Sequence, residues 1–356
     1  REKWSKMSPK ERSLTRTIIG QVNGMENEFL AVLIQPNGAL SVTDKVTGRN
    51  WTDLGYFRDC SETGNPWEHV SVPFDEVLTT LGEQARISRI VAGDLVTTYK
   101  VELDWELPRG RSADEKRRSS DRVPYKITNL VTLRKGQPWV EIESTVENNA
   151  EDHYLQVSFP TQVDSASSIA SVPFDIVERS IALPDPSEYD EDIQTEHPMD
   201  RFVAIEDGSN GVALLNEGLK AYEPHDDDEQ TLSLTLLRCY PLRICITNLE
   251  MTDYSGQDKG SQCLGTHTFK YAFMPYAGTV ETAGVWQAAE RFNHAVRVAQ
   301  IGPSTAGTSP LAHSFLEVEN SALHVSAVKM SENGEGWIVR LFNPTDSTQS
   351  GTIRLN

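Results

Sequence analysis

The sequence predicts a mainly antiparallel β protein of the sandwich or barrel class. Three observations support this prediction. Apolar and polar residues alternate along most of the chain, and β-branched and aromatic residues are frequent, as expected for half-buried strands. Strong turn signals divide the alternating runs into hairpins. A single stretch shows the apolar periodicity of a helix, so helices cannot dominate the fold.

The hairpins follow one another in the first half of the chain. Residues 29–48 alternate on both sides of Pro36-Asn37-Gly38, a strong turn signal because Asn and Gly tolerate positive φ. Residues 85–107 repeat the scheme around Gly93-Asp94, and residues 125–148 repeat it around Lys135-Gly136. The hairpin is therefore the repeating unit of the predicted fold.

The helix is expected within residues 279–298, where Val280, Val285, Ala288, Phe292 and Val296 recur at near-helical spacing. A Gly/Ser/Thr/Pro-rich stretch at 302–310 has the composition of a linker. Four short alternating patterns follow it, and four strands are enough for a plausible sheet.

Two further stretches are predicted to be loops. Residues 108–124 are polar and rich in Arg and Ser, which is typical of a mobile hairpin tip or of a contact point for another chain. Residues 184–200 are acidic and contain three prolines, and a long loop across a sheet face is the expected structure.

Charge and hydropathy exclude several classes of protein. The formal net charge is −19 and the pI about 4.9, which argues against binding to nucleic acid or to an anionic membrane. No apolar run approaches the ~20 residues that a membrane-spanning helix needs. The basic first residues lack a following apolar region, so no signal peptide is predicted, and the missing initial Met suggests a chain cut from something longer. The four cysteines have no framework spacing, which favours reduced thiols in a cytoplasmic protein.

Several short motifs suggest chemistry, but each has a structural explanation. His225-x-Asp227 could hold a divalent metal, yet a site needs three or four ligands, and a solvated hairpin turn is the preferred interpretation. Glu68-His69 and Glu196-His197 suggest acid/base pairs, but adjacent residues on a strand point to opposite faces. The motifs of nucleophile-elbow hydrolases, P-loops and Rossmann domains are missing from the sequence.

The stretch GSQCLGTHTFKYAFMPYAG, residues 260–278, holds Cys263 and His267. If both lie on one strand, they share a face but are about 13 Å apart, too far for a nucleophile pair. The stretch is therefore predicted to be a wall of the sandwich.

The same stretch, together with five other blocks in the same order, resembles the C-terminal region of glycoside hydrolase family 38, the α-mannosidases, and particularly the bacterial mannosylglycerate-hydrolase-like branch. The resemblance covers roughly residues 25–356. The other blocks are residues 26–51, 171–179, 196–223, 232–239 and 339–355.

The resemblance implies a large supersandwich of the galactose mutarotase type, followed by part of a small β-sandwich domain. The expected organisation is residues 1–24 as a linker or cut end, 25–301 as the supersandwich domain, 302–310 as a linker and 311–356 as the start of the small domain.

The resemblance also implies a function. Family members carry zinc and a nucleophilic aspartate in an N-terminal catalytic domain, and the matching motifs are missing here. The chain is therefore expected to be the non-catalytic C-terminal portion of a retaining α-mannosidase, with no cofactor of its own. Its expected partners are its own catalytic domain and a mannose-containing carbohydrate, either an oligosaccharide or mannosylglycerate, and a homo-oligomer is left open. The alternatives are a free-standing carbohydrate-binding β module and a sugar epimerase with a His/Glu pair, for which no matching constellation is seen.

Two loops are predicted to reach the sugar cleft of the intact enzyme. Both place charged or amide side chains beside prolines or glycines at strand ends, where loops project from a rigid scaffold. The candidate residues are Asp175 and Arg179 in the first loop, and Asp253, Lys259 and Gln262 in the second.

Overall fold

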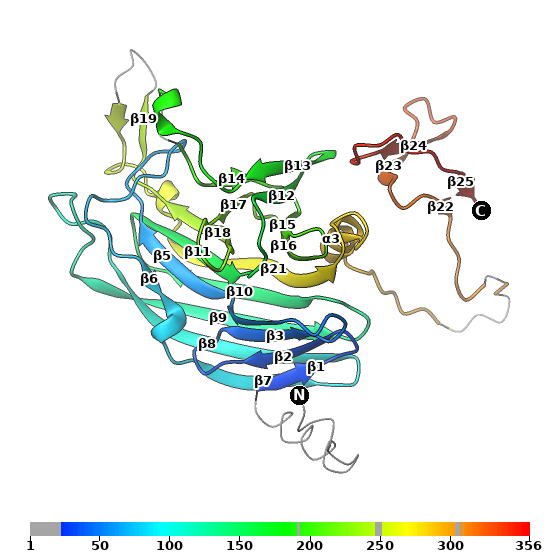
Figure 1. The fold of residues 1–356 in the computed structure, drawn as a ribbon, viewed down its shortest axis with the longest axis horizontal. Helices are drawn as coiled ribbons and strands as arrows, with labels where there is room; N and C mark the ends of the chain where they lie inside the picture. Colours follow the sequence, from blue (N-terminus) through cyan, green and yellow to red (C-terminus); the bar gives the residue numbers. More distant parts are fainter. Residues whose placement is uncertain (1–22, 191–192, 246–250, 303–306, 309) are drawn as a thin grey trace, which may run out of the picture.

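Antiparallel strands make up most of the structure. The computed structural model describes residues 23–190, 193–245, 251–302, 307–308 and 310–356. Every strand pairing within these ranges is antiparallel. Figure 1 shows the strands stacked as a large layered sandwich, with a small β module set apart at the C-terminal side. The mainly β, antiparallel sandwich predicted from the sequence is confirmed.

The largest layer is a sheet of nine strands. In spatial order the strands are β13 (Asp175–Ser180), β12 (Ser167–Val172), β15 (Phe202–Glu206), β16 (Asn210–Glu217), β21 (Gly265–Ala277), β10 (Val140–Asn148), β9 (Arg122–Arg134), β8 (Val96–Pro108) and β7 (Arg86–Ala92). The turn predicted at Gly136 joins β9 to β10, and this glycine has φ +81°, a conformation that residues with a Cβ rarely adopt. The residues 260–278 that were predicted to form a wall supply β21, at the centre of the sheet.

Two smaller sheets cover one face of the nine-stranded sheet. The six-stranded sheet has the order β14 (His197–Pro198), β17 (Ala221–Pro224), β18 (Thr231–Cys239), β11 (His153–Pro160), β5 (Tyr56–Ser61) and β6 (Leu78–Thr79). The four-stranded sheet has the order β1 (Gly24–Glu26), β2 (Leu30–Ile34), β3 (Leu40–Asp44) and β4 (Asn50–Leu54). Gly38, with φ +88°, forms the predicted turn between β2 and β3.

The main core lies between these layers. On β8, Val101, Leu103 and Leu107 are at most 2% exposed, and they alternate with charged residues that face outwards. Aromatic rings join the layers: the Phe273 ring of β21 lies 5.7 Å from that of Trp51 and 6.1 Å from that of Phe159. Burying each large apolar side chain contributes about 1.5–3 kcal/mol, so the alternating pattern decides which face of each strand points inwards.

A second, smaller core lies on the other face of the nine-stranded sheet, beneath helix α3 (Val285–Asn293). The helix lies within the predicted range 279–298 but is shorter. Gly284 precedes it with φ +67°, and Thr282 accepts a hydrogen bond from the backbone N–H of Thr279, so this segment forms a turn instead of helix. Val296 is 88% exposed and lies beyond the last helical turn.

The remaining elements are short. They are η1 (Thr80–Gly82), η2 (Pro186–Glu188), η3 (Gly260–Gln262), the pair β19 (Arg243–Cys245) and β20 (Met251–Asp253), and the C-terminal pairs β22 (Leu316–Val318) with β25 (Ile353–Leu355) and β23 (His324–Met330) with β24 (Trp337–Phe342). The C-terminal pairs contact the sandwich through the Trp286 ring, which lies 5.4 Å from the Phe342 ring and 5.1 Å from the His324 ring. The domain boundaries given above stay a prediction.

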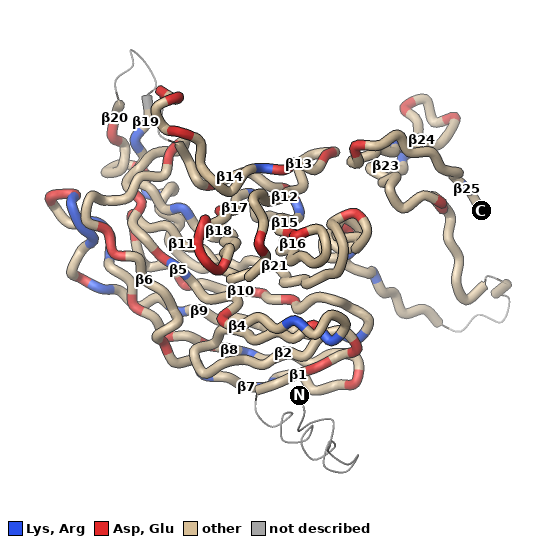
Figure 2. Tube along the Cα trace, viewed as in Figure 1, with Lys and Arg blue, Asp and Glu red and all other residues tan. Residues whose placement is uncertain are grey.

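The structure shows where the acidic residues lie and whether any helix could span a membrane. Figure 2 shows acidic residues spread over many loops and strand ends instead of gathered in one segment. Among the described residues, no helix is both long and apolar enough to span a bilayer.

Candidate functional site

The outer face of the six-stranded sheet carries a connected network of buried polar side chains. Strand alternation turns Phe57, Leu155 and Val157 into the core, so their neighbours point outwards, away from it. These outward residues and the loops above them form what we call the polar face. Its residues are Arg58, Glu62, His69, Tyr154, Gln156, Thr195, Glu196, Glu223, His225, Ser233, Thr235 and Arg238.

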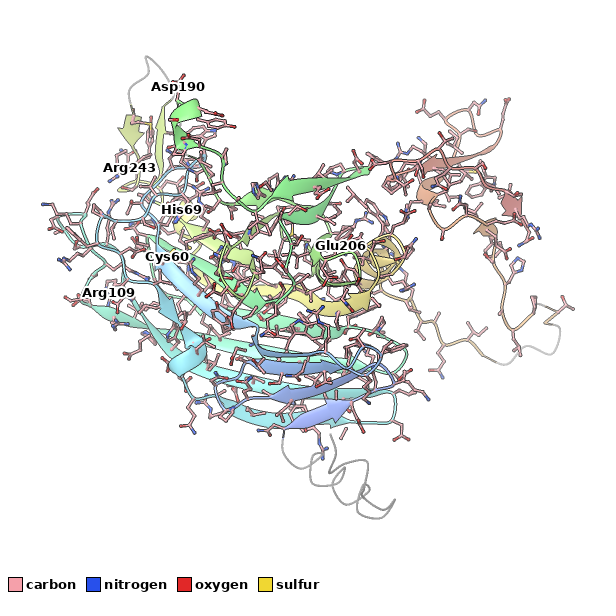
Figure 3. All side chains as sticks on the ribbon, viewed as in Figure 1. Cys60, His69, Arg109, Asp190, Glu206 and Arg243 are labelled. Atoms are coloured by element: carbon pink, nitrogen blue, oxygen red, sulfur yellow. The ribbon has the colours of Figure 1, made fainter. Side chains whose placement is uncertain are left out.

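One end of the polar face is built around Glu62, which is 0% exposed. Its carboxylate accepts a hydrogen bond from Arg238 Nε at 2.8 Å and lies 2.7 Å from Nδ1 of His69. Arg238 also donates to the carbonyl of Glu68 at 2.7 Å, so it fixes the loop that carries His69. Figure 3 shows His69 near Cys60, over the strands of this sheet.

The centre of the polar face is Tyr154, 2% exposed, whose ring lies 4.7 Å from the His69 ring. Its hydroxyl donates to Glu196 at 2.9 Å and lies 2.8 Å from the hydroxyl of Thr235. Gln156 donates to the same hydroxyl at 2.9 Å and to Glu223 at 2.7 Å. Residues 194–196, part of the stretch 184–200 predicted to be a loop across a sheet face, therefore lie over the polar face and supply Glu196.

The other end of the polar face opens into a pocket of about 280 Å³. The pocket is lined by Ile181, Leu183, Thr195, Glu223, Pro224, His225, Asp226 and Asp227. Glu223 accepts from Thr195 Oγ1 at 2.6 Å, and His225 Nε2 lies 2.8 Å from Ser233 Oγ. Carboxylate, imidazole and hydroxyl groups thus surround a small concave space with an apolar side, the pattern of many small-molecule sites.

The surroundings lower the pKa of three groups of the polar face, Glu62, Glu223 and His225. Burial raises the pKa of Glu223, but the charge of His225 and the hydrogen bonds from Thr195 and Gln156 outweigh it and hold the pKa below the ordinary value. The pKa of Glu62 is lowered in the same way, because the hydrogen bond from His69 and the interaction with Arg238 outweigh burial. Burial lowers the pKa of His225, although Glu223 opposes this shift.

The first predicted cleft loop lies on the hairpin of β12 and β13. Asp175 is exposed and accepts a hydrogen bond from the backbone N–H of Ile176. Arg179 lies against Tyr222, donating to its hydroxyl at 3.2 Å and stacking over its ring. The hairpin tip contacts the C-terminal module, because the Phe174 ring lies 5.5 Å from the Phe342 ring.

The second predicted loop lies elsewhere, since Figure 1 shows β13 and the β19–β20 pair well apart. Asp253 is exposed and pairs with Arg243 at 3.1 Å, and hydrogen bonds from Ser255 lower its pKa to about 2. Lys259 pairs with Glu151 at 2.6 Å. Gln262 is 1% exposed, and its side-chain amide is bonded to Asp152 at both ends. The structure does not bring the two loops together, and the substrate role of all five residues stays a prediction.

The two Glu-His dipeptides differ: Glu68-His69 lies in a loop between β5 and β6, whereas Glu196-His197 stands at the start of β14. Glu196 reaches Tyr154 on the polar face, whereas the His197 ring lies 5.7 Å from that of Tyr222, a core residue. The partners that do form, Glu62 with His69 and Glu223 with His225, were missed. The second pair is an i,i+2 pair at the end of a strand, a spacing that places both residues on one face and could have revealed it.

The strand geometry assumed for Cys263 and His267 is wrong. The strand begins at Gly265, and Cys263 lies in a left-handed turn with φ +47°. The turn brings His267 Nε2 within 2.7 Å of the Cys263 carbonyl oxygen. The imidazole contacts the backbone of Cys263, so the pair is still not a nucleophile dyad.

His225 and Asp227 do not share a ligand site in the structure. Asp227 accepts hydrogen bonds from the backbone N–H groups of Glu229 and Thr231, which is the hairpin turn expected from the sequence. Within the described ranges, no three His, Cys, Asp or Glu side chains are grouped so that they could hold a metal ion.

Comparison with known proteins identifies the family. Residues 25–240 match the model of the glycosyl hydrolases family 38 C-terminal domain, and residues 322–356 match that of the C-terminal β-sandwich domain of the same family. The chain is 27% identical over 354 residues to a Halalkalibacterium halodurans protein provisionally named a mannosylglycerate hydrolase, covering 94% of this chain and 38% of that protein. It is 21% identical over 332 residues to α-mannosidase G of Dictyostelium discoideum, covering 89% of this chain and 27% of that protein.

The structural comparison agrees with the sequence comparison. The crystal structure of an α-mannosidase from Enterococcus faecalis superposes with a TM-score of 0.80 at 26% identity, over 94% of this chain and 38% of that chain. The chain thus spans about two fifths or less of the length of these relatives. The family predicted from the sequence is confirmed: the chain belongs to glycosyl hydrolases family 38 and consists of C-terminal β structure of that family.

Proposed function

We propose that this chain is the non-catalytic β portion of a retaining α-mannosidase, which supports the catalytic domain and contributes to carbohydrate binding. The observation that carries the proposal is the match of residues 25–240 to the C-terminal domain of the family, in relatives of which the chain spans at most about two fifths. The catalytic domain is then the chain's principal partner within the same protein. A cytoplasmic location is part of the proposal and rests on the cysteine pattern alone.

The chemistry of the polar face supports a binding role over a catalytic one. Retaining glycosidases use two carboxyl groups about 5–5.5 Å apart, one as nucleophile and one as acid. Here the carboxylates of Glu62, Glu196 and Glu223 each accept hydrogen bonds from neighbouring side chains of the chain itself. Hydrogen bonds of this kind hold a carboxylate in place as an acceptor and lower its basicity.

The pocket beside Glu223 is the part of the polar face that we propose for a sugar. It combines the apolar side chains of Ile181 and Leu183 with polar groups from Thr195, Glu223 and His225. A sugar presents hydroxyl groups at its rim and C–H groups on its faces, and a mixed lining of this kind suits both. Because its polar groups are already positioned by the network, binding would not require them to reorganise.

Hydrolysis of a chromogenic aryl α-mannoside tests whether the catalytic activity lies outside this chain. The printed 356-residue chain is expected to be inactive with and without added zinc and to hold no stoichiometric zinc, whereas the longer enzyme that contains it is active. Zinc-dependent turnover by the printed chain would contradict the proposal.

Kinetics of the longer enzyme test the contribution of the chain to the substrate site. Glu223→Gln, Arg179→Ala and Lys259→Ala are expected to lower kcat/KM without changing zinc content or folding. A loss confined to KM indicates equal binding in the ground and transition states. The matched control is Lys126→Ala, whose exposed side chain pairs with Glu147 on the outer face of the nine-stranded sheet. Wild-type kinetics in all three test variants would assign the chain a purely structural role.

A free-standing carbohydrate-binding module is the second candidate. Trp67, in the loop that carries His69, is 66% exposed and could stack on a sugar. Calorimetric titration of the printed chain with mannose oligosaccharides separates the two proposals, because a module binds sugar without a catalytic domain. An upstream coding stretch for an Asp- and His-rich β/α domain would favour the mannosidase.

A further inference from the structure

Two cysteines that are far apart in the sequence meet at one end of the sandwich. Cys239 is the last residue of β18 and is 0% exposed, and Cys263 follows η3 and is partly exposed. Asn148 links them, because its side-chain amide donates to Cys239 Sγ at 3.5 Å and to the Cys263 carbonyl at 2.9 Å. The amide nitrogen of Asn148 is therefore shared by the two cysteines, and their thiols interact closely enough for each to shift the pKa of the other.

Cys263 has a strained backbone. It adopts φ +47° and ψ +39°, the left-handed region that residues with a Cβ rarely occupy. Such outliers persist where the surrounding structure fixes them, and they are frequent at functional sites. Here the fixing contacts are the hydrogen bonds that its carbonyl receives from Asn148 and shares with His267.

The surroundings of Cys263 favour its thiolate. Interaction with the Cys239 thiol lowers the pKa of Cys263 to about 6, assisted by His267 and His153 and opposed by burial. The His153 ring is itself buried, with Nδ1 2.6 Å from an Asp59 carboxylate oxygen and Nε2 3.1 Å from Asn148 Oδ1. Both ring nitrogens thus face oxygen atoms, and these contacts fix the ring beside Asn148, the residue that bridges the two cysteines.

Cys60 shows that this environment is specific to one thiol. Cys60 is also buried, on β5, but burial raises its pKa far above the ordinary value. A reactive thiol of the redox-sensing kind has a low pKa, some exposure and a second thiol beside it. Cys263 and Cys239 meet all three conditions together, whereas Cys60 has neither the low pKa nor the exposure.

We propose that Cys263 and Cys239 form a reversible disulfide, in which Cys263 reacts with hydrogen peroxide and Cys239 resolves the product. In the first step the Cys263 sulfur attacks the peroxide, an S–O bond forms, the O–O bond breaks, and water leaves once the released oxygen is protonated. In the second step the Cys239 sulfur attacks the Cys263 sulfur, an S–S bond forms, the S–O bond breaks, and a second water leaves. Two thiols and hydrogen peroxide thus give one disulfide and two waters, and two electrons pass from sulfur to oxygen.

Oxidation of Cys263 in the first step makes Cys239 a better nucleophile for the second step. The pKa of the Cys239 thiol is raised mainly by its interaction with Cys263 and then by burial. Conversion of Cys263 to a neutral sulfenic acid removes the negative charge that Cys239 faces. Cys239 then ionises more readily, while Asn148 still donates to its sulfur.

The disulfide would tie the end of β18 to the beginning of β21. The chain between the two cysteines includes the β19–β20 pair and the predicted substrate residues Asp253 and Lys259. Oxidation would therefore add a covalent link where residues 240–262 leave and rejoin the sandwich, a point that hydrogen bonds from Asn148 and the packing of Cys263 on the core hold in the reduced state.

Peptide mapping after treatment with hydrogen peroxide tests the proposal. At pH 7 a thiol of pKa about 6 is about nine tenths ionised, so the Cys263 thiol is expected to be alkylated at least tenfold faster than that of Cys60. Peroxide is expected to give a Cys239–Cys263 cross-link, a mass loss of two hydrogens, and full reversal by dithiothreitol. In Cys239→Ala, a dimedone adduct should accumulate on Cys263, because the resolving thiol is missing.

Cys60→Ala is the matched control, since it removes a buried thiol from the same sheet and should leave the cross-link unchanged. Circular dichroism establishes that each variant is folded, and Cys239→Ser replaces Cys239→Ala if the latter is not. Failure of the wild-type protein to form the cross-link, or alkylation of Cys263 no faster than Cys60, would overturn the proposal.

Discussion

Arg118 is expected to be the most important single charge for the stability of the sandwich. It lies in the tip between β8 and β9, a stretch predicted from the sequence to be a mobile hairpin end or a contact for another chain. In the structure its guanidinium, 5% exposed, reaches back to β5 and pairs with the Asp59 carboxylate, which is 0% exposed. Nη1 also lies 3.4 Å from the carbonyls of Asp59 and Glu76. The tip is therefore anchored to the six-stranded sheet by a buried ion pair.

Arg118→Met keeps an unbranched apolar stem and removes the charge, which leaves the buried Asp59 carboxylate beside His153 but without the guanidinium. Breaking a buried ion pair in this way costs about 3–5 kcal/mol. Arg122→Met is the control on the same hairpin, because this guanidinium is 4.0 Å from Glu76 and both side chains are largely exposed. An exposed pair of this kind contributes about 0–1 kcal/mol.

Urea unfolding measures both changes. Arg118→Met should lower the midpoint without changing the slope m, which reports the surface exposed on unfolding. Adding Asp59→Asn to Arg118→Met should cost less than the sum of the two single losses, because the unpaired buried charge is then removed. A loss for Arg118→Met below about 1 kcal/mol, equal to that of the control, would refute the buried-pair reasoning.

Three further predictions concern other parts of the chain. The unfolding free energy should fall as the pH is lowered from 7 to 4, and urea midpoints measured across this range can show it. The pKa of His225 is lowered in the fold, so its contribution is lost below about pH 6.5. The pKa of Glu223 is also lowered, and its contribution is lost below about pH 4.5. Gly211→Ala should destabilise the protein by about 1–3 kcal/mol in thermal unfolding, because its Cβ would lie 2.3 Å from the ring of Tyr276. Phe174→Ala should speed proteolytic release of the C-terminal module while leaving the midpoint of the main sandwich unchanged, since this ring is 54% exposed and packs on that module.

The sandwich could be predicted from the sequence because its layers follow from a local pattern, the alternation of apolar and polar residues between turns. The alternation on β8 decides which face is buried, and Gly38 and Gly136 mark turns that require positive φ. The helix was placed correctly but extended too far, because apolar spacing continues to Val296 while the turn at Gly284 and the end at Asn293 depend on local hydrogen bonds. The spacing of apolar residues predicts which face of a helix or strand is buried, and it says less about where the helix or strand ends.

The polar face could not be predicted in the same way. Its contacts join residues far apart in sequence, such as Gln156 with Glu223 and Glu62 with Arg238. In an alternating strand the polar positions are normally exposed, so Tyr154 and Gln156 gave no sign that the loop carrying Glu196 covers them. Cys263 was misplaced for a related reason, since it was assigned to the strand that begins two residues later.

The two outer faces of the sandwich differ in a way that bears on function. On the nine-stranded sheet the outward charges form exposed pairs, such as Lys126 with Glu147 and Arg134 with Glu141, which contribute little to stability and mainly keep the surface hydrated. On the six-stranded sheet the outward groups are buried or partly buried and are bonded to one another. Burying Glu62 and Glu223 is favourable only if their hydrogen bonds are kept, so their positions are fixed before any ligand arrives. Water hydrates hydrogen-bond acceptors in any arrangement, so fixed positions matter only when a ligand binds. The polar face is therefore the surface on which binding should be tested first.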